Sequence, residues 1–411
     1  MERGRLQPSR LRHALPLALA FTAMFASAPG QSFLFAVFVD HILAGTGLSR
    51  TAFSALYAAA TVVSATLSFG LGHAADRIGL RAVWATVAAG LAAACLLESL
   101  AGGIVVAAVG LALLRSFGQG SFPLLGTLVV NHWYPRRRGA AMATASFGLT
   151  AASVLLPPLL ALLIDGVGWR GAYRLIAVVL ALGVLPLALL VRVPAAAGAA
   201  APDAPQPDLP APRVVRRVGR RGVPLPNRSA ALLLVALSSP ALVTTAITFH
   251  AVSLLAGRGI DAPAAAAALS LLGVAAAAGT LAAGALADRL GTRSILAVLT
   301  GTLTAGSAIL LLQSGTASYL AFAVIGLGNG VWGIANGIVW ARTYGLASLG
   351  RIQGLASAAT IAAAAAGPLP LALSDGATGS YTAGLLFLVA TAGVALTAAL
   401  AWRPPHAYRS R

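Results

Sequence analysis

The sequence predicts an all-α polytopic membrane protein with twelve transmembrane helices, arranged as two six-helix bundles. Of its 411 residues, 58% are hydrophobic and 9% are charged, and the mean hydropathy is +0.87. Apolar runs recur at close to the roughly 20 residues that a helix needs to cross a bilayer. A short charged turn occurs once in each half of the chain. Too few polar groups are present to cover a water-soluble globule, so the helices must face lipid.

The repeated turn indicates an internal duplication. Gly72–Arg81 reads Gly-His-Ala-Ala-Asp-Arg-Ile-Gly-Leu-Arg, and Gly284–Arg293 reads Gly-Ala-Leu-Ala-Asp-Arg-Leu-Gly-Thr-Arg. The match extends back without a gap to Gly47 in one half and Gly259 in the other. Each copy therefore includes a helix of membrane-spanning length and the turn that ends it.

The first half, residues 1–192, is predicted to contain six spans. Ala26-Ser27-Ala28 imitates a signal-peptidase site, but the apolar run continues to Val39 and Pro29 stands where a mature chain would begin, which favours an uncleaved first span. The predicted spans are 14–40, 50–75, 82–101, 103–130, 139–164 and 171–192.

Residues 193–228 are predicted to be a cytoplasmic linker rich in proline and arginine. Its basic cluster is interpreted either as a lipid-binding or regulatory helix, or as a solvated loop held at the cytoplasmic leaflet by its charge. The second bundle, residues 229–411, follows with predicted spans at 229–256, 263–287, 294–314, 318–341, 353–374 and 381–402.

The distribution of arginine predicts the orientation. The side that holds both termini and the linker carries most of the arginines, whereas the opposite side has only Arg50, Arg170, Arg174 and Arg258. Both termini are therefore expected in the cytoplasm, with lipid headgroups rather than nucleic acid as the partner of the positive charge. The basic residues are all arginine, which together with the richness in alanine and glycine suggests a GC-rich bacterial genome, and we therefore expect the chain in a bacterial inner (plasma) membrane.

The sequence offers little for catalysis. The single cysteine, Cys95, lies in an apolar run, so the chain cannot form an internal disulfide or a thiol metal site. It shows no metal-binding cluster, nucleophile–base pair or nucleotide-binding loop, so we expect neither an enzyme nor a cofactor. A non-transporting membrane receptor is a remaining alternative.

Polar side chains within the predicted spans mark a candidate substrate site, because such groups are costly in a bilayer. They fall on the first, fourth, seventh and tenth spans, which are the first helices of four three-helix units, so they are expected to face one central axis. These residues are Gln31, Arg115, Gln119, His250, Asn329 and Asn336.

Arg115 is the most informative of these residues. It lies about 18 Å into its span at 1.5 Å per residue, near the midplane, and remains protonated. The acidic residues lie near helix ends, so an anionic solute is a candidate partner for its charge, with Gln119 one turn away adding a hydrogen bond. The alternative is a structural arginine bonded to helix carbonyls, or one that reaches the Asp76 turn.

The other candidates also have two interpretations. His250 is a candidate carrier of a coupling proton or a hydrogen-bonded packing residue. Asn329 and Asn336, seven residues apart on one helix face, are interpreted as binding a carboxylate or hydroxyl of the solute, or as bonding neighbouring helices.

The repeated pattern Gly-x-x-x-Asp-Arg-x-Gly-x-Arg resembles the signature loop of the major facilitator superfamily of secondary transporters. The resemblance covers nearly the whole chain, and it implies the major facilitator fold, alternating access and a cavity lined by helices 1, 4, 7 and 10. It also implies that the loops act as conformational latches. The latch residues are then Gly72, Asp76, Arg77, Gly79 and Arg81 in the first copy, and Gly284, Asp288, Arg289, Gly291 and Arg293 in the second.

Three further stretches resemble the monocarboxylate-transporter-like branch, which includes bacterial exporters. They begin at Arg115, Trp133 and Gly168 and read Arg-Ser-Phe-Gly-Gln-Gly-Ser-Phe-Pro, Trp-Tyr-Pro-Arg-Arg-Arg-Gly and Gly-Trp-Arg-Gly-Ala-Tyr. Members that carry lactate-type acids often have an arginine in helix 8, which is absent here, so monocarboxylate specificity does not follow. We expect a monomeric transporter of a small organic anion such as a carboxylate, with a proton as a candidate coupling ion. The alternative is an exporter of drug-like or amphipathic compounds.

Overall fold

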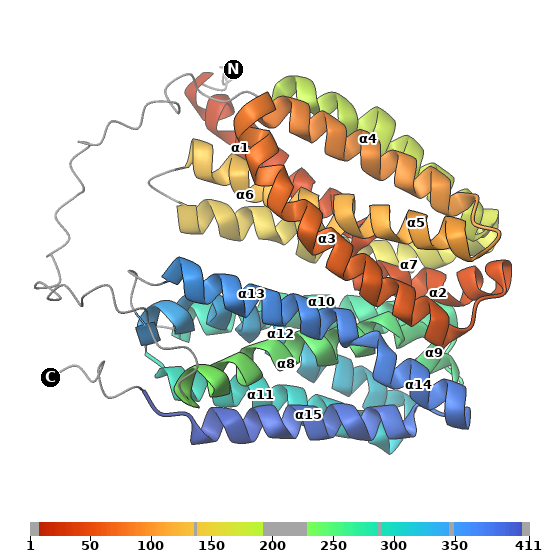
Figure 1. Cartoon of the computed structure of the whole chain (residues 1–411), viewed down its shortest axis with the longest axis vertical. Helices are drawn as coiled ribbons and strands as arrows, with labels where there is room; N and C mark the ends of the chain where they lie inside the picture. Colours follow the sequence, from red (N-terminus) through yellow and green to blue (C-terminus); the bar gives the residue numbers. More distant parts are fainter. Residues whose placement is uncertain (1–7, 135–137, 192–227, 287–288, 345–348, 405–411) are drawn as a thin grey trace, which may run out of the picture.

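The computed structural model describes residues 8–134, 138–191, 228–286, 289–344 and 349–404, and over these residues it is helical without a β-strand. Figure 1 shows the helices as two bundles side by side, α1–α7 in red to yellow-green and α8–α15 in green to blue. The predicted linker 193–228 lies outside the described residues except for Arg228, and the exact domain boundaries stay a prediction.

Helices of the first bundle are interrupted at several points. Their bounds are α1 Pro8–Ala26, a 3₁₀ turn η1 Ala28–Gly30, α2 Ser32–Thr46, α3 Arg50–Ile78, α4 Leu80–Ser99, α5 Ile104–Leu114, a π-helical turn η2 Arg115–Ser121, α6 Phe122–Trp133, α7 Arg138–Val179, a π-helical turn η3 Leu180–Val184 and a 3₁₀ turn η4 Leu185–Leu190. Thus the first and fourth spans are each broken near their middle, beside Pro29 and Pro123.

The second bundle has similar breaks. Its helices are α8 Arg228–Phe249, α9 Ala251–Ala256, α10 Ala262–Leu286, α11 Thr292–Ile309 with a 3₁₀ turn η6 Leu310–Leu312, α12 Gly315–Tyr344, α13 Leu349–Ala366, α14 Pro368–Thr378 and α15 Thr382–Ala401. His250 separates α8 from α9, and Gly367 separates α13 from α14.

The structure supports the predicted twelve-helix topology. Among the described residues, 10 helical segments are long and apolar enough to cross a membrane. One of them, Ala141–Leu190, holds two crossings, because α7 turns at Gly168, whose φ of 71° is rarely adopted by other residues. The remaining crossing is α3, which is 29 residues long.

The two bundles are joined at the end of the molecule where α3 begins. Arg50 on α3 forms ion pairs with Asp40 on α2 (Nη2–Oδ1, 2.6 Å) and with Asp375 on α14 (Nε–Oδ2, 3.1 Å). Its Nη1 also donates to Ser253 Oγ on α9 at 2.7 Å. We call Asp40, Arg50, Ser253 and Asp375 the Arg50 clamp, and this end of the molecule the clamp end; α2, α9 and α14 meet there in Figure 1.

The buried core, like the polar contacts, joins the two bundles toward the clamp end. One apolar cluster includes residues of both bundles, and in it Tyr57 of α3 packs against Phe249 of α8 with ring centroids 4.6 Å apart. A second cluster, around Trp340, contains described residues of the second bundle only. The bundles therefore share a core toward the clamp end, whereas the second bundle has a core of its own away from it.

The repeated turns lie at the opposite end, where α3 and α10 finish (Figure 1). The two copies differ in backbone, since Gly79 has a φ of 84° and Gly291 a φ of −68°. Only the first copy therefore needs a glycine for its conformation. Arg77, Arg81, Arg289 and Arg293 are exposed, while Asp288 and the side chain of Asp76 lie outside the described part of the chain.

Candidate functional site

The centre of the first bundle is built from two breaks in neighbouring helices. The turn η1 packs against the π-helical turn η2, and the contact depends on Gly30 and Gly118. A Cβ atom on Gly30 would collide with the backbone of Leu114 and Gln119, and one on Gly118 would collide with Gly30. Proline at position 29 favours the break in span 1, and π-helical turns are frequent at functional sites.

Arg115 lies at this contact and is completely buried, with 0% of its surface exposed. Its Nη1 donates to the Gly30 carbonyl oxygen at 2.8 Å, and its Nε and Nη2 donate to Thr61 Oγ1 at 3.2 and 3.0 Å. The guanidinium carbon lies 4.3 Å from the centre of the Tyr57 ring, a cation–π distance. These groups are neutral, and no described carboxylate lies within ion-pair distance of Arg115.

Thr61 connects Arg115 to a cavity. Its hydroxyl donates to the Tyr57 carbonyl oxygen at 2.8 Å and accepts two bonds from Arg115. The same residue lines a cavity of about 360 Å³, whose walls are Thr61, Ser64, Ala65, Gln119, Gly120, Leu124 and Ile361. Because Ile361 lies on α13 and the other residues belong to the first bundle, this central cavity lies between the bundles.

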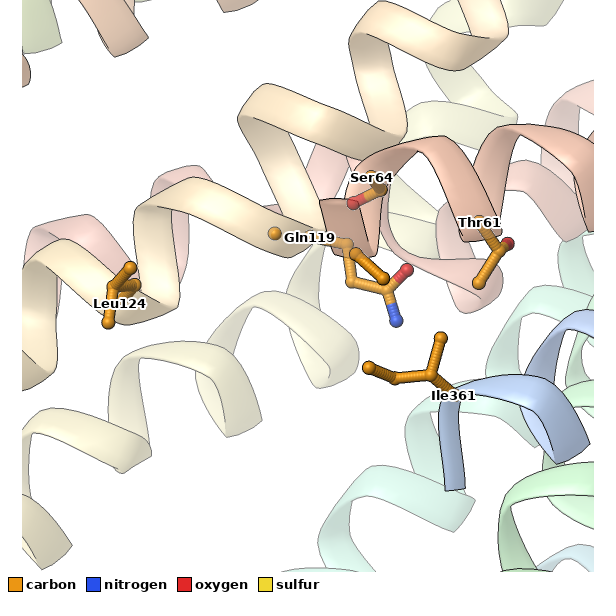
Figure 2. A pocket seen from close by; sticks show the side chains of 7 residues that line it. Thr61, Ser64, Gln119, Leu124 and Ile361 are labelled. Carbon is orange, nitrogen blue, oxygen red and sulfur yellow. The ribbon is translucent and has the colours of Figure 1, made fainter. Parts of the chain in front are cut away.

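Gln119 is the polar side chain at the middle of this cavity. Figure 2 shows it extending from η2 toward Ile361 of the second bundle, with Thr61 and Ser64 above it on α3. Its Oε1 atom is buried without a hydrogen-bond partner among the described residues. A buried amide oxygen without a donor is unfavourable, so this atom is available to a polar solute.

The remaining predicted site residues make other contacts. Gln31 follows Gly30 directly and donates from Nε2 to Ser27 Oγ at 3.2 Å. His250 is buried, with Nε2 located 2.9 Å from the Pro368 carbonyl oxygen. Asn329 accepts a bond at Oδ1 from Thr244 on α8 at 2.8 Å, and Asn336 is half-buried on α12.

The structure thus brings Arg115, Gln119 and Gln31 to two adjacent turns, while His250 and Asn329 bond to neighbours within the second bundle. Sequence reasoning missed Tyr57, Thr61 and Ser64 of α3. All three contact Arg115, and Thr61 and Ser64 also line the central cavity. The sequence contained a signal for this group, because the three residues are spaced i, i+4, i+7 and so lie on one face of a helix.

Among the described residues, no group of three or more His, Cys, Asp or Glu side chains is placed to hold a metal ion. Tyr381, which precedes α15 beside the Arg50 clamp, has its pKa raised to about 12 by burial, although the positive charge of Arg50 opposes the shift. Its phenol therefore stays neutral near the clamp.

Solved transporter structures share this fold. A D-xylose–proton symporter matches with a TM-score of 0.72 and 15% identity, covering 97% of this chain and 98% of that chain. A bacterial homologue of the human lysosomal transporter Spinster, in an inward-facing and occupied conformation, matches with a TM-score of 0.72 and 17% identity over 99% and 100%. A nucleoside transporter matches with a TM-score of 0.68 and 15% identity over 94% and 98%.

Sequence comparison gives the family. Monocarboxylate transporter 11 of Homo sapiens is 46% identical over 70 residues, which are 16% of this chain and 14% of that transporter, so the match spans a small part of the relative. This similarity agrees with the predicted monocarboxylate-transporter-like branch. The family model described as Major Facilitator Superfamily matches residues 19–368, most of the chain. The chain therefore belongs to the major facilitator superfamily, as a multi-pass secondary transporter rather than an enzyme.

Proposed function

We propose that this transporter moves a small organic anion, such as a carboxylate, by alternating access, and that Arg115 is the cation that binds it. The observation that carries the proposal is the environment of Arg115. A permanent positive charge is fully buried in the membrane beside the central cavity, and its described partners are neutral oxygens and a ring face. Buried charges are costly unless paired, so an anion in the cavity would be strongly favoured.

The geometry gives a simple route for binding. A carboxylate next to Thr61 would accept the guanidinium hydrogen bonds that now go to Thr61 Oγ1 and the Gly30 carbonyl oxygen. Charge-assisted bonds of this kind are about twice as strong as neutral ones. The Gln119 amide, at the middle of the cavity, would donate to the second carboxylate oxygen, and Gln31 lies next to the Gly30 turn that would be released.

The Arg50 clamp supports alternating access. It joins α2 and α3 of the first bundle to α9 and α14 of the second, and the central cavity lies between the bundles. With the termini in the cytoplasm, as the arginine distribution predicts for a bacterial inner membrane, the clamp end faces outward and the structure is inward-facing. The outward-facing state would then require the clamp to open and the repeated turns, residues 72–81 and 284–293, to close the other end.

We also propose that His250 carries a proton that is coupled to transport. Its Nε2 contacts the Pro368 carbonyl oxygen at the break between α13 and α14, while Nδ1 is buried without a described partner. His250 also packs beside Tyr381, 5.7 Å between ring centroids, near the Arg50 clamp. A proton on Nδ1 would thus add charge next to the region that must open.

Export of amphipathic or drug-like compounds is the second candidate function. It is favoured by the apolar part of the central cavity, which consists of Ala65, Leu124 and Ile361. The two functions differ in their need for charge on the solute, because an uncharged amphipathic compound gains little from Arg115.

The deciding experiment is uptake and exchange of carboxylates in proteoliposomes by Arg115→Ala, compared with Arg174→Ala, which removes an exposed arginine. The proposal expects Arg115→Ala to lose transport and Arg174→Ala to retain it, with folded protein recovered for both. Carboxylate transport by folded Arg115→Ala at the wild-type rate would remove Arg115 from the site.

A further inference from the structure

A second cavity, of about 260 Å³, lies on the side of the first bundle between α1, η1, α2 and both crossings of α7 with η3. Among the described residues that line it, Thr22 has the only polar side chain, and the others are aliphatic or aromatic. Its floor includes Ala28 and Pro29, which are completely or almost completely buried. This cavity is separate in its lining residues from the central cavity around Gln119.

The mouth of this lateral cavity belongs to the lipid-facing surface. Leu159 and Val179, on the two crossings of α7, line it and have exposed fractions of 58% and 64%. Leu162 and Leu182, next to them on the same crossings, are exposed at 63% and 75%. Exposed apolar side chains on membrane-spanning helices face acyl chains, so the lateral cavity is continuous with the hydrocarbon phase.

Two helix breaks border the lateral cavity. The turn η1 interrupts span 1 at Pro29, and the π-helical turn Leu180–Val184 interrupts the last crossing of the bundle, just before Pro186. Such breaks pull the helix backbones out of regular packing. An apolar void of this size excludes water, and if left empty it forfeits the dispersion contacts of its lining.

The dimensions match a single hydrocarbon chain. The lining residues of the last crossing run from Leu175 to Val184, which corresponds to about 13 Å along a helix at 1.5 Å per residue. That length is close to half of the roughly 30 Å hydrocarbon core, the depth of one leaflet. We propose that the lateral cavity binds one acyl chain of a bilayer phospholipid, which inserts between the crossings of α7 and contacts the back of the Pro29 turn.

The test compares Leu180→Trp with Leu182→Trp. Both residues belong to the same π-helical turn, but Leu180 is buried in the lining of the lateral cavity and Leu182 points to the surface outside it. Each protein is reconstituted in vesicles of phosphatidylethanolamine and phosphatidylglycerol, extracted in mild detergent and analysed by native mass spectrometry. We expect wild type and Leu182→Trp to retain one phospholipid, and Leu180→Trp to retain about tenfold less, because the indole occupies the place of the chain.

A second matched pair keeps the test decisive if Leu180→Trp does not fold. Leu160→Phe adds volume at a buried lining position, and Leu162→Phe adds it at an exposed position outside the lining. The proposal is overturned if lipid retention is equal in the folded members of either pair. It is also overturned if the retained molecule is detergent or a transported solute in place of a phospholipid.

Discussion

Arg50 and Arg115 are two buried or half-buried arginines of one bundle, and their surroundings are opposite. Arg50, with 18% of its side chain exposed, contacts two carboxylates and a hydroxyl, and two of these partners belong to the other bundle. Arg115 is fully buried and contacts no described carboxylate, and the partners of its hydrogen bonds belong to its own bundle. The comparison teaches that charge balance separates the two arginines: two carboxylates of the protein neutralise Arg50, which we propose holds a conformation, whereas Arg115 has no such partner among the described residues, which is why we propose that it binds an anionic ligand.

The largest effect is expected from Arg115→Gln. The amide keeps some hydrogen bonding but removes the charge, so anion uptake should fall at least about thirtyfold, which corresponds to the lower end of the cost of breaking a buried charged pair. Initial rates in proteoliposomes measure the loss, with the recovered folded protein determined by size exclusion. A drop of less than twofold would place Arg115 in a structural role, like any other bonded arginine.

The second effect concerns the clamp. Arg50→Ala leaves Asp40 and Asp375 without their shared partner, so the clamp end should open more often. With Cys95→Ala as background, a cysteine placed at Thr248, which contacts Ser32 across the bundles, should react about tenfold faster with an impermeant maleimide. Arg174→Ala in the same background serves as the control.

That result would be contradicted by unchanged labelling of position 248 in Arg50→Ala. Arg50 would then not hold the clamp end closed, because its ion pairs would contribute no more free energy than ordinary surface ion pairs do.

A smaller effect is expected at Thr61, the residue between Arg115 and the central cavity. Thr61→Val keeps the shape but removes a hydroxyl that accepts two bonds from the guanidinium, so the apparent KM for the anion should change by about tenfold. Thr66→Val is the matched control, since Thr66 lies on the same helix and is exposed, with its hydroxyl bonded to its own helix. Equal kinetics in the two variants would separate Thr61 from the site.

The smallest effect is expected from Arg50→Lys. A lysine at this position keeps a charge between Asp40 and Asp375 but loses the planar fork that also reaches Ser253, so labelling at position 248 should rise only about twofold.

In contrast, Arg115→Lys should lose most transport, because a point charge cannot replace the bonds to Gly30 and Thr61 together. Similar outcomes for both lysine variants would remove the distinction between the two arginines.

The overall architecture was readable from the sequence because hydrophobic length and the repeated turn are local signals. The sequence also predicted Arg115 as a buried cation distant from carboxylates. The hydrogen-bond partners of Arg115 could not be predicted, because the Gly30 carbonyl becomes an acceptor only where spans 1 and 4 are broken at η1 and η2. Helix propensity does not locate a π-helical turn.

Contacts between segments that are distant in the chain could not be predicted from the sequence either. Arg50 and Asp375 are 325 residues apart, and nothing local links them. His250 and Asn329 were grouped with Arg115 by their place in equivalent helices, but their hydrogen bonds depend on how α8 packs against α14 and α12. The two copies of the repeated turn also looked equivalent, yet only Gly79 has a positive φ.

Ligand binding without transport tests the central claim most directly. A thermal-shift screen of the purified protein against organic carboxylates, each paired with its uncharged amide, is run on wild type and Arg115→Gln. We predict that at least one carboxylate raises the Tm of wild type, that its amide does not, and that Arg115→Gln shows neither shift. Equal stabilisation of both proteins by the carboxylate, or of wild type by the amide, would contradict the assignment of Arg115 as the anion-binding residue.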